Sequence, residues 1–253
     1  MDRKLGQRRK PDKIHAFVCT PAYDGKVDSD FANSLAEAAF CSPLYQIYMT
    51  ACAIRNGAFI EMARNVYVKM FIEDEQFAEC SHLFFIDADI QFEARAFVGL
   101  LRSGQPISAG VYRRRQEPED YPVLWTPNPE IGGLWIEDGW LMCRRVPTGF
   151  LCISRPVIEE MAADAPKIRV TGQKGYVPWV FGTKFEKLDD NADTGFIGED
   201  FSFCDNYVAK YGKQIPVWMD FDFTHAGYKG NLLKYLEKQI EAEEKKIQQS
   251  SAA

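Results

Sequence analysis

Long apolar runs are missing from this sequence. No stretch approaches the roughly 20 apolar residues of a membrane-spanning helix, and no apolar signal-peptide core follows the basic start from Met1 to Lys13. We therefore expect a protein that has no membrane span and acts in a cytoplasm. Residues 1–13, which include Arg8-Arg9-Lys10, are expected to form a flexible basic tail.

Paired cysteines are missing as well. The seven cysteines are scattered singly along the chain, and none belongs to a Cys-x-x-Cys pair, so the sequence predicts no zinc site. Several of them lie in apolar runs, where cysteine behaves as a small core residue. This usage favours a reducing compartment.

An excess of positive charge is absent. The formal net charge is -6, which argues against binding of nucleic acid by overall charge but leaves room for a local basic patch. Aromatic residues make up 13% of the chain and many lie in its second half, which indicates a cleft with stacking surfaces.

Length and composition predict one large α/β domain or two small ones, since 253 residues with 46% hydrophobic content can bury a sizeable core. No internal repeat or convincing boundary is visible. We assign residues 14–230 to a single domain and residues 231–253 to a C-terminal helix and tail. Leu233, Leu236 and Ile240 share one stripe of that helix, which could mediate association of two chains.

Apolar strands alternate with amphipathic helices, a pattern typical of an α/β fold with a mostly parallel central sheet. Segment 45–54 is ambiguous, but the alternation of Ile47, Met49 and Ala51 favours a strand. Residues 167–198 are aromatic and weakly periodic, and we interpret them as a flexible functional loop. Strands are expected at 14–20, 45–54, 83–86, 106–111, 151–154 and 215–219, with a small antiparallel sheet from 122–126, 133–136 and 140–143. Helices are expected at 31–40, 58–73, 94–101, 156–163, 201–211 and 232–249.

Two carboxylates follow the apolar strand Leu83 to Ile86, namely Asp87 and Asp89. In open α/β sheets ligands bind at the carboxyl ends of the strands. Two carboxylates so close repel each other unless a cation lies between them, and a hard divalent cation that also binds phosphates suits them. The alternative is that Asp89 caps a helix starting near Phe92 and Asp87 is a solvated turn residue.

The loop from Thr20 to Gly25 follows the first strand and can hold a nucleotide. Tyr23 can stack on a base and Asp24 can accept a hydrogen bond from a ribose, although Asp-Gly is also ordinary turn chemistry. Arg64, early in its helix, can bind a diphosphate bidentately or can be a plain surface arginine.

Two further segments have open roles. Arg113, Arg114 and Arg115 follow a predicted strand and can face an anionic ligand, or can be solvated beside the acidic residues after them. Gly149 either lets a backbone approach a ligand closely or marks a bulge.

Together these segments resemble the GT-A fold nucleotide-sugar glycosyltransferases. The resemblance covers most of residues 13–230 and is carried by Phe85-Ile86-Asp87-Ala88-Asp89, Gly198-Glu199-Asp200 and Phe223-Thr224-His225. The loop from Thr20 and the triplet Ala63-Arg64-Asn65 also look like those of small stand-alone enzymes of large viruses and phages. Some of those relatives glycosylate hydroxymethylated DNA bases and others build glycans, so the cytoplasm would be that of a host cell.

The resemblance implies a metal site and a donor site. Asp87 would lie near the ribose and a metal-bound water, and Asp89 would bind Mn²⁺ or Mg²⁺. His225 would be a further metal ligand or a diphosphate contact, unless it is a buried strand histidine. Residues implied to bind the nucleoside-diphosphate sugar are Thr20, Pro21, Tyr23, Asp24, Arg64, Asp87 and Ala88.

The resemblance also implies a catalytic role for the acidic pair Glu199 and Asp200. Asp200 would be the general base of an inverting enzyme, whereas the plain alternative is that both residues compensate the helix dipole. The expected reaction moves a sugar, with a UDP-sugar favoured, to a hydroxymethylated pyrimidine in DNA or to a glycan. Segments 112–115 and 167–198 would form the acceptor side.

Two rival functions fit the sequence less well. A phosphatase of the haloacid dehalogenase type also places Asp-x-Asp after an apolar strand, but Ile90-Gln91 departs from the residues that family has next, and the strand is not the first of the chain. A non-enzymatic nucleic-acid or glycan binder could use the arginines and surface aromatics, but the net acidity counts against it.

Overall fold

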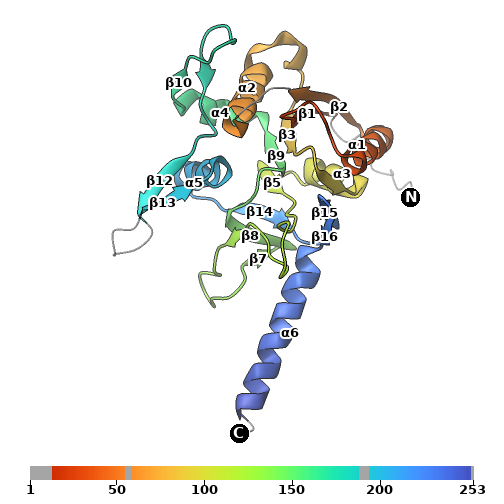
Figure 1. Cartoon of the computed structure of the whole chain (residues 1–253), viewed down its shortest axis with the longest axis vertical. Coiled ribbons are helices and arrows are strands. Elements are labelled where there is room, and N and C mark those ends of the chain that lie inside the picture. Colours follow the sequence, from red (N-terminus) through yellow and green to blue (C-terminus); the bar gives the residue numbers. More distant parts are fainter. Residues whose placement is uncertain (1–12, 55–58, 188–193, 252–253) are drawn as a thin grey trace, which may run out of the picture.

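The computed structural model describes residues 13–54, 59–187 and 194–251. The expected basic tail lies almost entirely outside these ranges. Figure 1 shows an α/β body from which one long helix extends.

A nine-stranded mixed sheet forms the centre of the body, with the order β2-β1-β3-β9-β5-β14-β8-β6 and with β7 paired to β8. β1 pairs in parallel with β2 and β3, and β5 pairs in parallel with β14, whereas β9 lies antiparallel between β3 and β5. Five strands, β2, β1, β3, β5 and β14, therefore run the same way, as the alternating pattern predicted. The strands are β1 Ile14–Pro21, β2 Ile47–Ile54, β3 His82–Ile86, β5 Ile107–Ala109, β6 Leu124–Trp125, β7 Ile136–Glu137, β8 Trp140–Arg145, β9 Phe150–Ser154 and β14 Ile215–Trp218.

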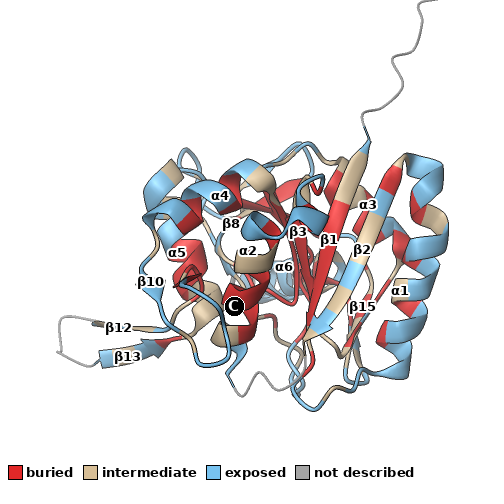
Figure 2. Ribbon diagram, turned by 90° about the horizontal axis from the view of Figure 1, so that it is seen from above, coloured by how far each residue is buried: buried red, intermediate tan, exposed pale blue. Residues whose placement is uncertain are grey.

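Helices cover both faces of this sheet (Figure 2). α2, α4 and α5 cover one face, and α1 and α3 cover the other. Side chains alternate between the two faces along a strand, so that Leu83 and Phe85 pack on the α2 side while Phe84 and Ile86 pack on the α3 side. The helices are α1 Ser29–Cys41, α2 Ile60–Glu73, α3 Ala94–Arg102, α4 Arg155–Asp164 and α5 Glu199–Tyr211, with 3-10 turns η1 Ser42–Tyr45 and η2 Glu75–Phe77.

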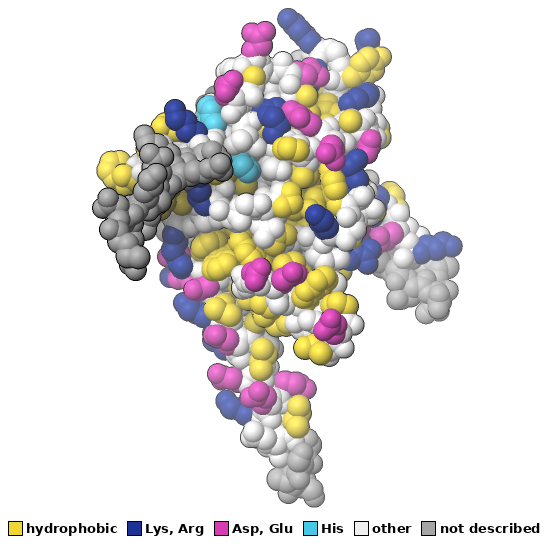
Figure 3. Space-filling model, turned by 180° about the vertical axis from the view of Figure 1, so that it is seen from behind, with side chains coloured by type: hydrophobic (Ala, Val, Ile, Leu, Met, Phe, Trp, Pro, Cys, Tyr) yellow, Lys and Arg dark blue, Asp and Glu magenta, His cyan; other side chains and the backbone are white. Residues whose placement is uncertain are grey.

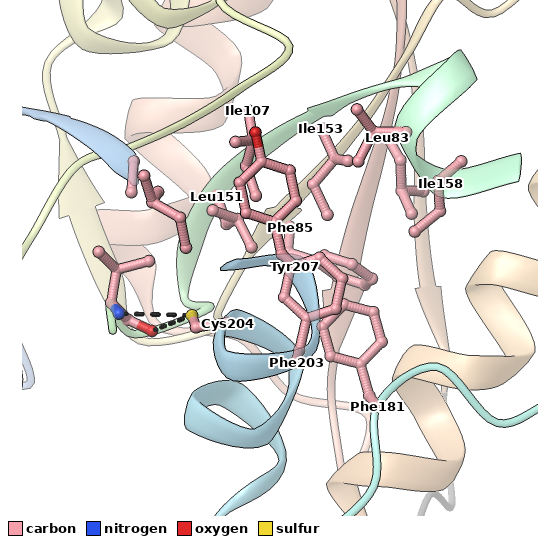
Figure 4. Packing of buried hydrophobic residues seen from close by; sticks show 14 of the residues in the cluster. Leu83, Phe85, Ile107, Leu151, Ile153, Ile158, Phe181, Phe203, Cys204 and Tyr207 are labelled. Carbon is pink, nitrogen blue, oxygen red and sulfur yellow. Dashed lines mark hydrogen bonds between the residues drawn. The ribbon is translucent and has the colours of Figure 1, made fainter. Parts of the chain in front are cut away.

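The core on the α2 side is rich in aromatic rings. Phe85 lies edge-on to Phe181, which stacks on Phe203 of α5 with ring centroids 4.5 Å apart (Figure 4). The buried thiol of Cys204 donates a hydrogen bond to the carbonyl of Val146 and accepts one from the amide of the same residue, so this thiol belongs to the core. All seven cysteines are unpaired.

The segment 167–198 differs from the expected flexible loop. Its described residues form two hairpins, β10 Lys167–Ile168 with β11 Val177–Pro178 and β12 Lys184–Lys187 with β13 Thr194–Ile197. Phe181 lies between the two hairpins. The side chain of Asn65 on α2 accepts a hydrogen bond from the amide of Phe181 and donates one to its carbonyl, which holds this stretch against the helix. The interpretation as a loop was wrong, because the described residues pair into two local hairpins and the Asn65 side chain fixes the backbone of Phe181 between them.

A three-stranded antiparallel sheet lies beside α1. It consists of β16 Tyr228–Gly230, β15 Phe223–His225 and β4 Ile90–Phe92, in that order. β4 follows the Asp87-x-Asp89 motif directly, so the motif lies between the central sheet and this smaller one.

The predicted C-terminal helix is confirmed as α6, Leu232–Ser251, which extends away from the body (Figure 1). Charged side chains of both signs cover it (Figure 3), and Ile240 and Ile247 are exposed on it. Within the described ranges, no helix combines the length and apolar character needed to cross a membrane.

Candidate active site at the carboxyl end of β3

An open pocket of about 450 Å³ lies at the carboxyl end of β3. The loop after β1 forms one wall, and the Asp87-Ala88-Asp89 turn forms another. The structure thus brings together most residues that the sequence assigned to donor and metal binding. The lining residues are Pro21, Ala22, Tyr23, Asp24, Lys26, Val27, Asp28, Ile60, Asp87, Ala88, Asp89 and Arg115.

The residues of the β1 loop differ in how far they reach this pocket. Tyr23 is 71% exposed and free to stack on a ligand, and the Asp24 carboxylate holds Lys26 at 3.1 Å. Thr20 is buried, and its carbonyl accepts a hydrogen bond from Tyr67, so its side chain does not line the pocket.

A tight turn places the two aspartates. The amide of Asp87 donates to the carbonyl of Gly149, and the carbonyl of Asp87 accepts from the amide of Ile90. The alternative helix-capping role of Asp89 is wrong, because β4 follows it and α3 begins only at Ala94. Asp87 continues the alternation of β3 and lies on the α2 side, while Asp89 lies toward β15.

Arg64 is a buried residue of the site and not a surface arginine. It lies on the stripe of α2 that also carries Tyr67, Val68 and Phe71, which spacing of three, four and seven residues turns toward the core. Its Nη2 lies 3.3 Å from Asp87 Oδ1 and its Nε lies 3.2 Å from Glu199 Oε1. These two carboxylates keep its pKa raised despite the burial that opposes its charge. Its Nη1 is buried without a protein partner.

Glu199 and Asp200 open α5 beside this arginine, where the helix dipole favours negative charge. Asp200 Oδ1 accepts from the amide of Phe201 at 2.7 Å. Burial raises the pKa of both carboxyl groups, although Arg64 opposes the shift in each. Asp87 and Glu199 thus pair with one buried guanidinium, whose charge also acts on the adjacent Asp200.

Asp89 belongs to a second group, with His225 and Arg115. Asp89 Oδ2 and His225 Nε2 are 3.7 Å apart, and the guanidinium of Arg115 contacts both, with its Nε 2.8 Å from His225 Nε2. Burial raises the pKa of Asp89, while Arg115 and His225 oppose that shift. His225 reaches Asp89 because β15 pairs with β4 and places His225 opposite Ile90.

The hydrogen bonds of His225 assign its tautomer. Its Nδ1 lies 3.0 Å from the carbonyl of Arg113, an acceptor only, so Nδ1 carries the proton. Nε2 then presents a lone pair, which Arg115 uses as an acceptor. An imidazole whose other nitrogen donates to a backbone carbonyl is typical of a metal ligand. Both ring nitrogens thus have protein partners, which a purely structural histidine would also show.

Gly149 lets two side chains approach the turn closely. A Cβ atom at this position would lie 2.2 Å from the Tyr112 hydroxyl and 2.5 Å from Asp87 Oδ2. Tyr112 is buried, which raises its pKa well above the ordinary value, with Asp87 adding to the shift. The adjacent Thr148 hydroxyl is buried without a protein partner. Glycine is therefore required here by close packing and not by a bulge.

The three consecutive arginines point in different directions. Arg113 is buried and bonded to Glu117, and Arg114 pairs with Asp120 on the surface. Only Arg115 lines the pocket. In the sequence the three arginines could not be distinguished, whereas in the structure Arg115 alone of the three lies at the pocket.

The side chains fit a divalent cation in part. Ligands each about 2.1 Å from one ion can be at most about 4.2 Å apart, so the separation between Asp89 Oδ2 and His225 Nε2 suits a shared ion. A cationic group, the Arg115 guanidinium, already lies against both atoms. Asp87 is turned to Arg64, and in the part of the chain that the structure describes no three His, Cys, Asp or Glu residues form a metal-binding group. An ion held by Asp89 and His225 would thus need further ligands from water or substrate.

Sequence reasoning placed Tyr112 and Arg115 in the acceptor-side segment 112–115 without assigning either to the donor or metal site, and it did not assign Lys26 at all. Arg115 could not be distinguished from its two neighbours, because only the fold separates their partners. A signal for the burial of Arg64 was present, namely its spacing from Tyr67, Val68 and Phe71.

Comparison with known proteins identifies no family. No family model matches the chain, and no curated protein matches it. Among solved structures the chain is similar to the crystal structure of A197 from STIV, with 16% identity and a TM-score of 0.46 over 84% of this chain and 85% of that one. At that level the similarity concerns the arrangement of the chain and carries no argument about function.

Proposed function

We propose that this protein is a metal-dependent glycosyltransferase that moves a sugar from a nucleoside-diphosphate sugar, a UDP-sugar, to an acceptor hydroxyl. The observation that carries the proposal is the pair Asp89 and His225. Oδ2 of Asp89, which lines an open pocket, lies 3.7 Å from Nε2 of His225, and the tautomer of His225 puts the ring lone pair on Nε2, where it accepts from Arg115. The loop after β1, which also lines this pocket, offers Tyr23 for a base and Asp24 for a ribose hydroxyl.

In this proposal Asp89 and His225 hold Mn²⁺ or Mg²⁺. The bound ion supplies Lewis-acid stabilisation of the departing nucleoside diphosphate. Arg64 keeps Asp87 and Glu199 at fixed positions, because it is buried and contacts both. Carboxylates held in this way keep the geometry that the reaction requires.

Asp200 accepts the proton of the acceptor hydroxyl in this proposal, as the base of an inverting reaction. Burial raises its pKa, and a carboxylate with a raised pKa is a stronger base near neutral pH. One oxygen is held by the amide of Phe201, which orients the carboxylate.

For the acceptor we favour a glycan over hydroxymethylated DNA. Hairpin β12–β13, which leads directly into α5, exposes Phe185 and Phe196 as a cross-strand pair with ring centroids 5.7 Å apart. Exposed aromatic rings of this kind stack on sugars. Three of the cations that could contact a DNA backbone, Arg113, Arg114 and Lys184, pair instead with Glu117, Asp120 and Asp205 of the protein.

The first experiment is a thermal-shift titration with UDP, GDP and ADP, each with and without Mn²⁺ or Mg²⁺. A transferase of this kind is stabilised by UDP only when the metal is present, because binding to the native state raises its stability. Equal stabilisation by UDP with and without metal would contradict the metal-dependent donor site.

The second experiment offers a labelled UDP-sugar with oligosaccharides, hydroxymethylated DNA and plain DNA side by side. We expect label on the oligosaccharides and a weak response to salt. Transfer to modified DNA, with a steep loss between about 50 and 200 mM salt, would establish the DNA acceptor instead. Metal-dependent UDP binding without transfer of any kind from a panel of sugars would favour a non-enzymatic binder.

A further inference from the structure

Arg115 lies where a metal ion would lie. Its Nη2 contacts Asp89 Oδ2, and its Nε donates to His225 Nε2 at 2.8 Å. These are the two atoms that the proposed function assigns to the metal. A lone pair of His225 Nε2 that accepts from Arg115 is not available to an ion, so arginine and metal exclude each other at this position.

The side chain of Arg115 borders solvent. Its side chain is 51% exposed, and it lies in the described stretch between β5 and β6, where it lines the pocket. The side chain of Arg113 is bonded to Glu117, and the amide of Arg114 donates to the carbonyl of Asp120, so the backbone next to Arg115 is held in place. A rotation of one side chain therefore suffices to vacate the position between Asp89 and His225.

We propose that Arg115 is an exchangeable counter-ion of the site. Without metal it neutralises Asp89 and occupies the lone pair of His225. When a divalent cation binds there, Arg115 turns into the pocket and binds the diphosphate of the donor, for which its planar fork is suited. This inference rests on the proposed function, and it assigns Arg115 as a donor-binding residue that also sets the order in which metal and donor bind.

The exchange predicts effects of opposite sign for one substitution. In Arg115→Ala the competing cation is gone, so Mn²⁺ alone should bind about tenfold tighter, as loss of a charged hydrogen-bonding competitor implies. In the same variant UDP should bind about tenfold more weakly when Mn²⁺ is saturating, because a phosphate contact is lost. Arg114→Ala is the matched control, since it removes the adjacent charge while leaving Arg115 in place.

Isothermal titration of wild type and both variants with Mn²⁺ alone, and then with UDP at saturating Mn²⁺, tests this. Opposite changes in Arg115→Ala, with neither change in Arg114→Ala, support the exchange. If the wild type binds Mn²⁺ but Arg115→Ala shows unchanged affinities or two changes of the same direction, the inference is overturned and the metal site stands. If the wild type binds neither Mn²⁺ nor UDP with Mn²⁺, the proposed function itself fails, and the inference with it.

Discussion

The guanidinium of Arg64 on α2 contacts the carboxylate of Glu199 on α5, with Nε 3.2 Å from Oε1, across 135 residues of sequence. The same guanidinium holds Asp87 at the end of β3. One side chain that is almost fully buried therefore joins two helices and the central strand at the point where they meet the pocket.

We expect Arg64→Met to lower the free energy of unfolding by about 3 kcal/mol, because removing one partner of a buried ion pair leaves carboxylates without compensation. Urea denaturation measures this change. Arg114→Met removes a half-exposed partner of Asp120 and should cost at most about 1 kcal/mol. Equal losses in the two variants would show that Arg64 does not hold the site together.

Asp89→Ala should abolish metal-dependent UDP binding while the fold stays intact. Among the described residues, Arg115 and His225 are the partners of this carboxylate, and the backbone bond from the amide of Ala226 to the Asp89 carbonyl survives the substitution. Titration calorimetry with Mn²⁺ and UDP checks the loss, and circular dichroism checks the fold. Asp120→Ala, which removes an exposed carboxylate paired with Arg114, is the control; unchanged UDP affinity in Asp89→Ala would contradict the metal assignment.

Asp200→Asn should bind the donor nearly normally and transfer the sugar roughly 10²–10⁴-fold more slowly, since an amide cannot take a proton from the acceptor. Steady-state kinetics with separate kcat and donor KM values measure this. Near-normal turnover would move the role to Glu199 or indicate a reaction that retains configuration. Asp222 is a poor substitute, because it lines a different pocket beside Lys229.

The same substitution should stabilise the protein at neutral pH. Burial raises the pKa of Asp200 above its ordinary value of 3.8, so the folded state disfavours the carboxylate, and stability is lost as pH rises toward the folded pKa. Asparagine avoids that loss, so the melting temperature of Asp200→Asn should exceed that of the wild type at pH 7 and approach it near pH 3.5. Asp30→Asn, in the exposed first turn of α1, should instead be slightly destabilising at pH 7, because it loses only a favourable dipole interaction. A constant difference across this pH range for Asp200→Asn would contradict the prediction.

Gly149→Ala should weaken both stability and donor binding. The new methyl group would overlap the Tyr112 hydroxyl and Asp87 Oδ2, and such overpacking costs about 1–3 kcal/mol. The double variant Gly149→Ala with Tyr112→Phe removes the nearest atom and should recover part of the stability. Thermal unfolding of the single and double variants measures the recovery, and its absence would locate the strain elsewhere.

Local patterns predicted most of the elements. The apolar run Leu83–Ile86 specified strand β3 and placed Asp87 and Asp89 at its end, because strand formation depends on neighbouring residues. The alternation of Ile47, Met49 and Ala51 correctly favoured strand β2. The prediction failed for the two hairpins within 167–198, because their strands have only 2 or 4 residues each and are too short to show a periodic pattern, and because the side chain of Asn65, far away in sequence, fixes Phe181 between them.

The sequence by itself determined the α/β class, the position of the Asp87-x-Asp89 turn and the candidate residues Asp200 and His225. Tertiary structure alone decided which arginine pairs with which acidic residue of the site. Arg64 meets Glu199, and Arg115 but not Arg113 or Arg114 meets Asp89. The physical reason is that hydrophobic periodicity is local, whereas the pairing of charges depends on where the packing of helices and strands carries each side chain.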